Sequence, residues 1–176
     1  FHNEDNYGAV LQTYALQKYL QSQGCAVEII NFIPRKSTFR LIDWIGRNPR
    51  KTILKWKNQI KKISGLDRCQ ERSKVFDVFR DNYLAVGSTV YSSHKSLKKL
   101  PPNVDVLIVG SDQVWSPLLV EYKDYSIYWL DFGSDQIKKI AYAASFGGEY
   151  GECKCFSGIP KWASSFSDIT ARERNG

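Results

Sequence analysis

Hydrogen-bonding side chains are concentrated in the segment 110–115, which reads Gly-Ser-Asp-Gln-Val-Trp. It directly follows the apolar run 104–109, which predicts a strand buried on both faces of a parallel sheet. Ligands bind outside the carboxyl ends of strands in such sheets, so this loop is the first candidate site. A helix cap needs only one serine or aspartate, and the added glutamine and tryptophan favour a binding function. The candidate residues here are Gly110, Ser111, Asp112, Gln113 and Trp115.

Two further loops follow predicted strands. Segment 144–148 contains Ser145 and Gly147, where the backbone either meets a ligand or merely turns. Arg172 follows the last short strand and offers a guanidinium fork to a phosphate or carboxylate, although charged residues at strand ends are usually solvated.

The segment 1–9 would link a truncated first strand to the first helix. Gly8 would let a ligand approach the backbone, and the free N–H groups at a helix start suit a phosphate or carboxylate. From the residues alone, Asn6 fits a plain helix cap equally well. Asn6, Tyr7 and Gly8 are therefore candidates for a ligand-lining role.

Several common sites are excluded by missing motifs. The sequence contains no Walker, G-x-G-x-x-G, G-x-S-x-G or H-E-x-x-H pattern. Cys153 and Cys155 lack the C-x-x-C spacing, and the histidines His2 and His94 stand far from them. We therefore expect neither a metal site nor a cofactor, and the few scattered cysteines favour a reducing cytoplasm.

The order of the predicted elements is typical of an α/β fold. Helical and strand segments alternate, which favours a doubly wound, mainly parallel, Rossmann-like sheet. The expected helices are 7–23, 71–83 and 160–166, and the expected strands are 26–33, 104–109, 127–132, 137–146 and 168–172.

Length and composition indicate a single folded domain. The chain has 176 residues, of which 43% are hydrophobic and 24% charged, and these proportions exclude a disordered chain. No apolar run approaches the roughly 18 residues of a membrane-spanning helix. Because the chain opens on Phe1 and ends just after a new element, we expect it to be a fragment, with residues 1–176 forming one Rossmann-like domain and a C-terminal domain absent.

Positive charge is concentrated in an insert at about 35–74. The net charge is 25 − 18 = +7, whereas residues 35–74 alone hold 13 basic and 3 acidic side chains, so the remainder carries −3. This distribution argues against nucleic-acid binding, which needs a basic face built from several elements. Within the insert, residues 49–63 have the pattern of a basic amphipathic helix, which either packs on its own domain or contacts an anionic membrane surface.

Five sequence blocks resemble the polysaccharide pyruvyl transferase family. They occur in the order of that family and extend over nearly the whole chain. The blocks are 6–17 (Asn-Tyr-Gly-Ala-Val-Leu-Gln-x-Tyr-Ala-Leu-Gln), 29–32 (Ile-Ile-Asn-Phe), 109–115 (Val-Gly-Ser-Asp-Gln-Val-Trp), 142–147 (Tyr-Ala-Ala-Ser-Phe-Gly) and 171–173 (Ala-Arg-Glu).

The resemblance implies a bacterial cytoplasmic transferase of surface-polysaccharide assembly, in exopolysaccharide or capsule biosynthesis. Such an enzyme moves pyruvate from phosphoenolpyruvate to two hydroxyls of a sugar as a ketal. The family is similar in fold to two-domain GT-B glycosyltransferases, and this chain matches the first half, so the isolated chain is expected to be incomplete for catalysis. Asp112 would be the base or sugar-hydroxyl acceptor, with Ser111 and Gln113 orienting the acceptor.

A secondary hypothesis places the enzyme at the inner face of the cell membrane. Acceptors in such pathways are often lipid-linked saccharides, and the basic segment 49–63 would then hold the enzyme near them. Two rivals remain open at this point: a GT-B-type glycosyltransferase that uses a nucleotide sugar, and a non-catalytic binding module.

Overall fold

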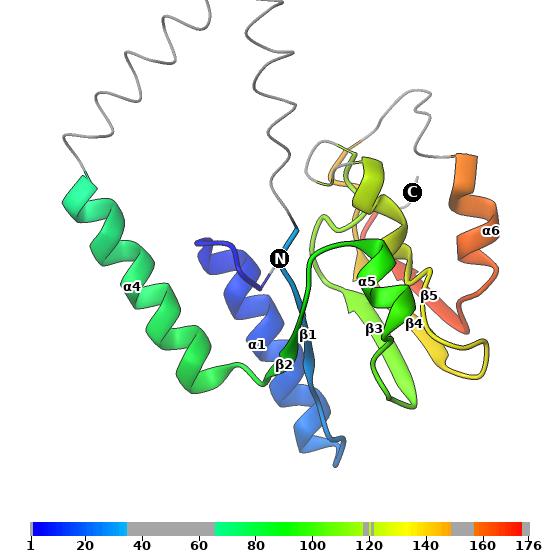
Figure 1. The fold of residues 1–176 in the computed structure, drawn as a ribbon, viewed down its shortest axis with the longest axis horizontal. Helices are drawn as coiled ribbons and strands as arrows, with labels where there is room; N and C mark the ends of the chain where they lie inside the picture. Colours follow the sequence, from blue (N-terminus) through cyan, green and yellow to red (C-terminus); the bar gives the residue numbers. More distant parts are fainter. Residues whose placement is uncertain (1, 35–65, 118–119, 121, 149–156, 174–176) are drawn as a thin grey trace, which may run out of the picture. The chain divides into compact units, whose positions relative to one another are not determined.

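The computed structural model describes residues 2–34, 66–117, 120, 122–148 and 157–173 (Figure 1). The chain divides into two compact units, one made of residues 1–34 and 85–176 and the other of residues 35–84. The candidate residues all belong to the first unit. The basic segment 49–63 lies outside the described residues.

Helix α1 (Tyr7–Ser22) begins and ends at residues whose chemistry fixes the ends of a helix. The Asn6 side chain accepts a hydrogen bond from the Ala9 N–H at 3.2 Å and caps the first turn. Gly24 follows the last turn with φ of 83°, a left-handed conformation that glycine adopts without steric cost. The buried Gln17 side chain accepts from the Ala85 N–H at 2.8 Å and thereby ties α1 to the residue that precedes strand β2 (Val86–Tyr91).

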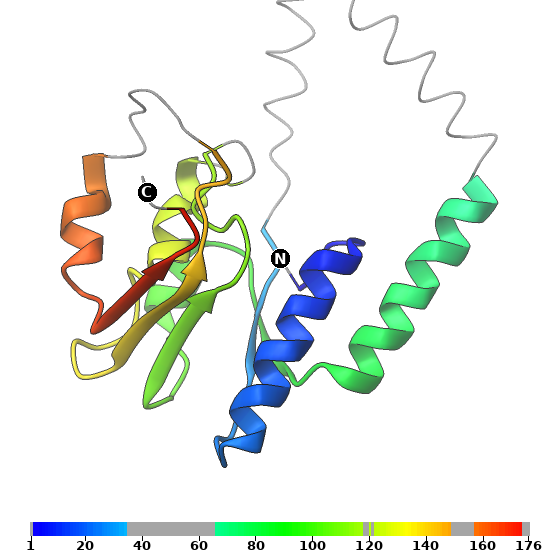
Figure 2. The ribbon, with the colours of Figure 1, turned by 180° about the vertical axis from the view of Figure 1, so that it is seen from behind.

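All the strands of the first unit that the structure describes pair in parallel. Strand β1 (Ile29–Phe32) pairs with β2 (Val86–Tyr91), and β3 (Val106–Gly110), β4 (Lys138–Ala144) and β5 (Asp168–Ala171) form a second sheet in that order (Figure 2). A mixed α/β fold with parallel sheets fits the predicted Rossmann-like architecture.

Three short helices complete this unit beside the sheets. The 3₁₀ helix η1 (Tyr122–Trp129) contacts both α5 (His94–Lys99) and α6 (Ile159–Ala163). Helix α5 is closed at its start by a capping box between Ser93 and Ser96. Helices η1 and α6 contribute aromatic side chains, and α5 contributes Leu97, to the hydrophobic core that also contains residues of β3 and β4.

An aromatic stack forms the centre of the core. The indoles of Trp115 and Trp129 lie parallel, with ring centroids 4.1 Å apart and an interplanar angle of 3°. Tyr125 is buried beside them, and its hydroxyl donates to the Trp115 carbonyl at 2.7 Å. Burial raises the pKa of Tyr125 to about 12, so this hydroxyl keeps its proton at every ordinary pH.

The second unit contributes helix α4 (Leu66–Tyr83), which begins five residues before the predicted start at 71. The sequence predicts that Phe76, Phe79 and Tyr83 form one buried aromatic stripe along this helix. Phe76 is buried as expected, but Tyr83 is exposed, so that prediction was right for only part of the stripe.

The structure corrects the sequence interpretation of two regions. Residues 127–132 were predicted to form a strand, but Ile127 and Trp129 belong to η1 and Leu130 has a φ of 52°. Both Ile127 and Trp129 are buried, and burial at alternate positions imitates the pattern of a strand. Strand β2 and helix α5 were not predicted, because their polar residues give no clear periodic pattern.

No helix within the described ranges has the length and apolar character needed to cross a membrane.

Candidate functional site

The loops after β3 and β4 are joined by two backbone hydrogen bonds. The Ser145 N–H donates to the Asp112 carbonyl at 3.0 Å, and the Trp115 N–H donates to the Ser145 carbonyl at 3.1 Å. Because β3 and β4 are parallel neighbours, both loops leave the sheet at the same edge. The structure thus brings together two of the four segments that the sequence singled out, 110–115 and 144–148.

A buried serine joins the segment at Arg172 to them. Ser145 is only 2% exposed, and its hydroxyl donates to Glu173 Oε1 while accepting from the Gly147 N–H at 2.9 Å. The neighbouring Arg172 N–H donates to the Ala144 carbonyl at 3.0 Å. The loops after β3, β4 and β5 therefore form one hydrogen-bonded group, which we call the loop cluster (residues 110–115, 144–147 and 172–173).

Glu173 is the residue of this cluster that sequence reasoning missed. The hydrogen bond from Ser145 holds the pKa of Glu173 below its ordinary value of 4.5, and the backbone N–H groups of Phe146 and Gly147 lower it further. Its second oxygen, Oε2, is buried and has no well-formed hydrogen bond among the described residues. Glu173 belongs to the Ala-Arg-Glu block at 171–173, which resembles the family. From this block only Arg172 was selected, because its guanidinium group could bind a phosphate or carboxylate.

The backbone at the start of the cluster leaves no room for a side chain. A Cβ at Gly110 would lie 2.5 Å from the Tyr142 carbonyl oxygen, so the close approach of β3 to β4 requires glycine. Ser111, which follows, has a φ of 57° and donates its N–H to the same Tyr142 carbonyl at 2.7 Å. Residues other than glycine are uncommon in this left-handed backbone conformation. At Ser111 the conformation turns the chain sharply ahead of Asp112.

Asp112 is partly exposed at this turn. Its Oδ1 accepts a hydrogen bond from the Gln113 N–H at 2.8 Å, which fixes the carboxylate to its own loop. Gln113 packs against Gly147, where a Cβ would lie 2.8 Å from the Gln113 side-chain amide carbon. Gly147 has a φ of 78°, so both space and backbone conformation favour glycine there.

Trp115 lies in the core beneath the loop cluster. It is 2% exposed, its indole N–H donates to the Tyr128 carbonyl at 3.0 Å, and its ring is stacked on Trp129. The structure thus places Trp115, like Ser145, where it supports the cluster from inside.

The segment 1–9 is organised differently. Asn6 caps α1, and a Cβ at Gly8 would lie 3.2 Å from Asn6 Oδ1, which is a tight local contact. Tyr7 is 59% exposed. Within the described ranges, no hydrogen bond joins Asn6 or Gly8 to the loop cluster.

The loop cluster offers one side chain suited to proton transfer and one suited to binding an anion. Asp112 supplies a carboxylate that is partly open to solvent, and the exposed Arg172 supplies a guanidinium. Across the described part of the chain, no group of three or more histidine, cysteine, aspartate or glutamate side chains is arranged to hold a metal ion.

We expect the substitution Glu173→Gln to remove a pH-dependent part of the stability. The folded-state pKa of Glu173 is depressed, so its contribution is present above the unfolded pKa and is lost as the pH falls through the folded value. The free energy of unfolding in urea, measured from about pH 7 to about pH 3.5, should therefore fall less steeply in the variant than in the wild type. Equal pH dependence in both proteins would contradict the assignment.

Comparison with known proteins identifies a family. A family model described as polysaccharide pyruvyl transferase matches residues 6–176. Neither the search of curated proteins nor the search of solved structures found a match.

Proposed function

The chain belongs to the polysaccharide pyruvyl transferase family, and we propose that it takes pyruvate from phosphoenolpyruvate and attaches it as a ketal to a saccharide. The family indicates pyruvyl transfer to polysaccharide in general. The observation that supports a site in this chain is the loop cluster, in which Ser145 holds the loop of Asp112 against the loop of Glu173.

The reaction of phosphoenolpyruvate determines which chemical groups the site needs. A sugar hydroxyl adds to the central carbon of phosphoenolpyruvate while a proton is delivered to the terminal methylene, which becomes a methyl group. A second hydroxyl then replaces the phosphate at the same carbon. Each hydroxyl must lose its proton, so the site needs a general base as well as a general acid, together with cations for the phosphate and carboxylate.

We assign the base, or sugar-hydroxyl acceptor, to Asp112. One of its oxygens is engaged with the Gln113 N–H, so the side chain is held while the group stays partly exposed. Ser111 and Gln113 flank it and would orient the acceptor sugar. Arg172 would contact an acidic group of the donor.

The remaining candidates fall into two groups. Gly110 and Gly147 allow the backbone to approach closely, while Trp115 and Ser145 hold the cluster in place from the core. Asn6, Tyr7 and Gly8 would line the other side of the ligand at the start of α1. The general acid and further cations would come from a second Rossmann-like domain of a GT-B-like enzyme, as the resemblance implies.

Phosphate release from phosphoenolpyruvate tests this function. With full-length protein and a panel of bacterial lipid-linked saccharides, we expect release only when an acceptor is present. Asp112→Asn should lower kcat by about 100-fold or more, since a positioned base contributes roughly 10²–10⁴-fold. Asp105→Asn, which precedes β3 and lies away from the loop cluster, is the matched control and should leave the rate unchanged.

Two outcomes would count against the proposal. Turnover of a UDP-sugar without any phosphate release from phosphoenolpyruvate would favour a glycosyltransferase. Unchanged turnover in Asp112→Asn would remove Asp112 from the chemistry while leaving pyruvyl transfer itself standing.

We also propose peripheral contact with the inner face of the cell membrane through residues 49–63, where lipid-linked acceptors would be met. The support is the excess of positive charge in the sequence of that segment. Replacing Lys55, Lys57, Lys61 and Lys62 by glutamine should reduce co-sedimentation with anionic vesicles at low salt. Unchanged co-sedimentation would contradict this part of the proposal.

A further inference from the structure

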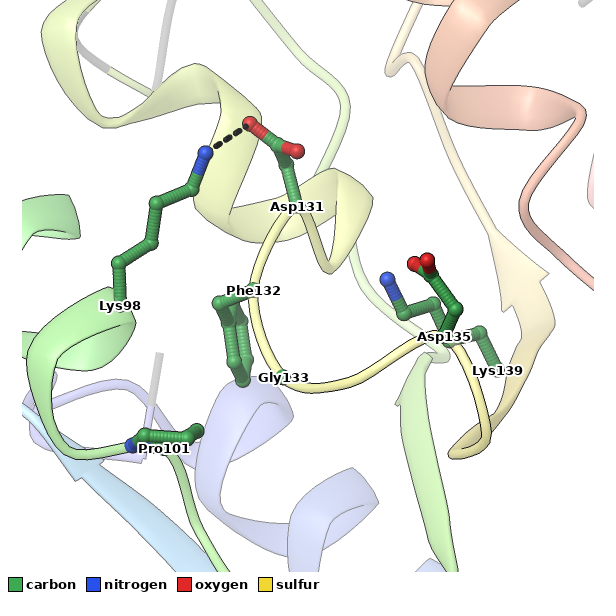
Figure 3. Close-up of a pocket in the computed structure, with 7 residues that line it drawn as sticks. All are labelled: Lys98, Pro101, Asp131, Phe132, Gly133, Asp135 and Lys139. Carbon is green, nitrogen blue, oxygen red and sulfur yellow. Dashed lines mark hydrogen bonds and ion pairs between the residues drawn. The ribbon is translucent and has the colours of Figure 1, made fainter.

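A polar pocket lies at the opposite end of the strands from the loop cluster. It has a volume of about 280 Å³, near the lower limit of roughly 300 Å³ for small-molecule sites (Figure 3). Its lining comes from the end of α5, the turn between η1 and β4, and the beginning of β4. The polar lining residues are Lys98, Asp131, Asp135 and Lys139.

Lys139 is an unusual residue for its position. It lies on β4 opposite Leu107 of β3, and the alternation of the strand places it on the same face as the buried Ala141. Lys139 is only 8% exposed, whereas lysines are rarely so buried without a partner. Among the described residues, it has neither an ion pair nor a side-chain hydrogen bond.

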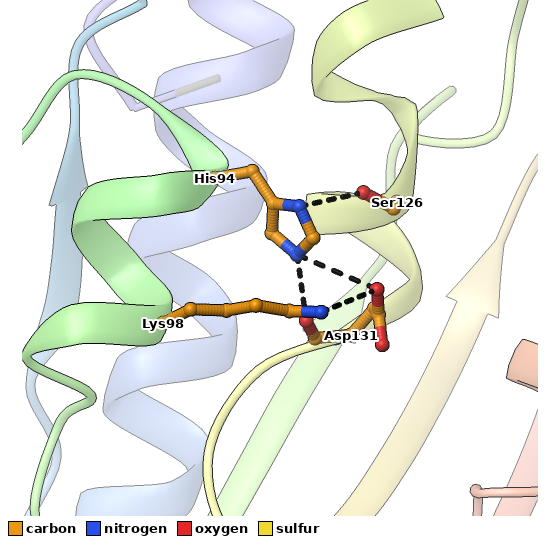
Figure 4. A network of polar contacts seen from close by, with 4 residues as sticks. All are labelled: His94, Lys98, Ser126 and Asp131. Atoms are coloured by element: carbon orange, nitrogen blue, oxygen red, sulfur yellow. Dashed lines mark hydrogen bonds and ion pairs between the residues drawn. The ribbon is translucent and has the colours of Figure 1, made fainter.

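One of the two carboxylates that line the pocket, Asp131, already belongs to a polar network. Asp131 Oδ2 lies 3.2 Å from Lys98 Nζ and 3.5 Å from His94 Nε2, and the same ring nitrogen lies 2.7 Å from the Asp131 carbonyl oxygen (Figure 4). The other ring nitrogen is 3.4 Å from the Ser126 hydroxyl. Asp131 is thus held by cationic and polar neighbours and does not neutralise Lys139.

Asp135 is the second carboxylate of the pocket and is exposed. Figure 3 shows its carboxylate on the same side of the pocket as the Lys139 amine, and no ion pair joins the two in the described structure. A molecule placed here would meet one ammonium group that lacks an anion and one carboxylate that can accept hydrogen bonds. Phe132 adds an apolar wall.

We propose that this pocket binds a small hydroxylated acid, whose carboxylate or phosphate contacts the Lys139 ammonium and whose hydroxyl donates to Asp135. The Lys139 side chain carries the proposal, because it is largely enclosed and has no counter-charge among the described residues, so an anion that enters the pocket would meet an unpaired ammonium. The site is separate from the loop cluster and does not depend on pyruvyl transfer.

Titration calorimetry with three probes tests the site: glucuronate, glucose 6-phosphate and neutral glucose. We expect one or both acids to bind and glucose to bind at least about tenfold more weakly, because a charge-assisted contact is lost. Glucuronate binding alone would identify a carboxylate site, and glucose 6-phosphate binding alone a phosphate site.

Two lysine variants locate the binding. Lys139→Gln should weaken the binding of the acid by about tenfold or more. The matched control is Lys138→Gln, at the adjacent but exposed position, where the side chain forms an ion pair with Asp168 at 3.3 Å. The control should bind like the wild type. Equal weakening by both variants would show a general effect of surface charge and overturn the proposal.

Nuclear magnetic resonance of the unmodified protein keeps the test valid if Lys139→Gln does not fold. Addition of the acid should shift the amide signals of Gly133 and Asp135 and leave that of Gly147 in place. Shifts confined to Gly147, or no binding of either acid up to about 10 mM, would overturn the proposal.

Discussion

The backbone of Ser145 fixes one edge of the β3–β4–β5 sheet. Its N–H and carbonyl hydrogen bond to residues of the loop after β3, and its hydroxyl bonds to Glu173 after β5. Because the residue is buried, these bonds are shielded from competition with water, and breaking one would leave a buried polar group unsatisfied. The position of Asp112 therefore depends on contacts made by a residue more than thirty positions later in the chain.

The aromatic core also contacts the loops at this end of the strands. Trp115 is held at its ring by Trp129, at its indole N–H by the Tyr128 carbonyl and at its own carbonyl by Tyr125. A loop whose last residue is fixed at three points has little freedom, and pre-organisation of this kind is what a site for positioned reactants needs. Trp115, for which the sequence predicts a ligand contact, is buried and packs in the core at the end of this loop.

The sequence was informative where local chemistry decides structure. The helix cap at Asn6, the buried strand ahead of Gly110 and the polar residues following strands could all be predicted, because each follows from neighbouring residues. Glu173 and Lys139 could not be singled out in this way. Their importance comes from burial and from contacts with segments distant in sequence, such as Ser145, which a pattern of neighbouring residues does not contain. The prediction of a strand at 127–132 was wrong because the apolar residues at alternate positions are buried residues of helix η1 and do not mark pairing with another strand.

Amide hydrogen exchange tests most directly whether the three loops form one rigid cluster. If the loops form one rigid cluster, the amides of Ser145 and Trp115, whose hydrogen bonds join the loops, exchange only through openings as costly as those that expose Ala141 in the centre of β4. Exchange of both amides as fast as that of the exposed Tyr7 at the start of α1 would show that the loops separate freely, and it would contradict the account.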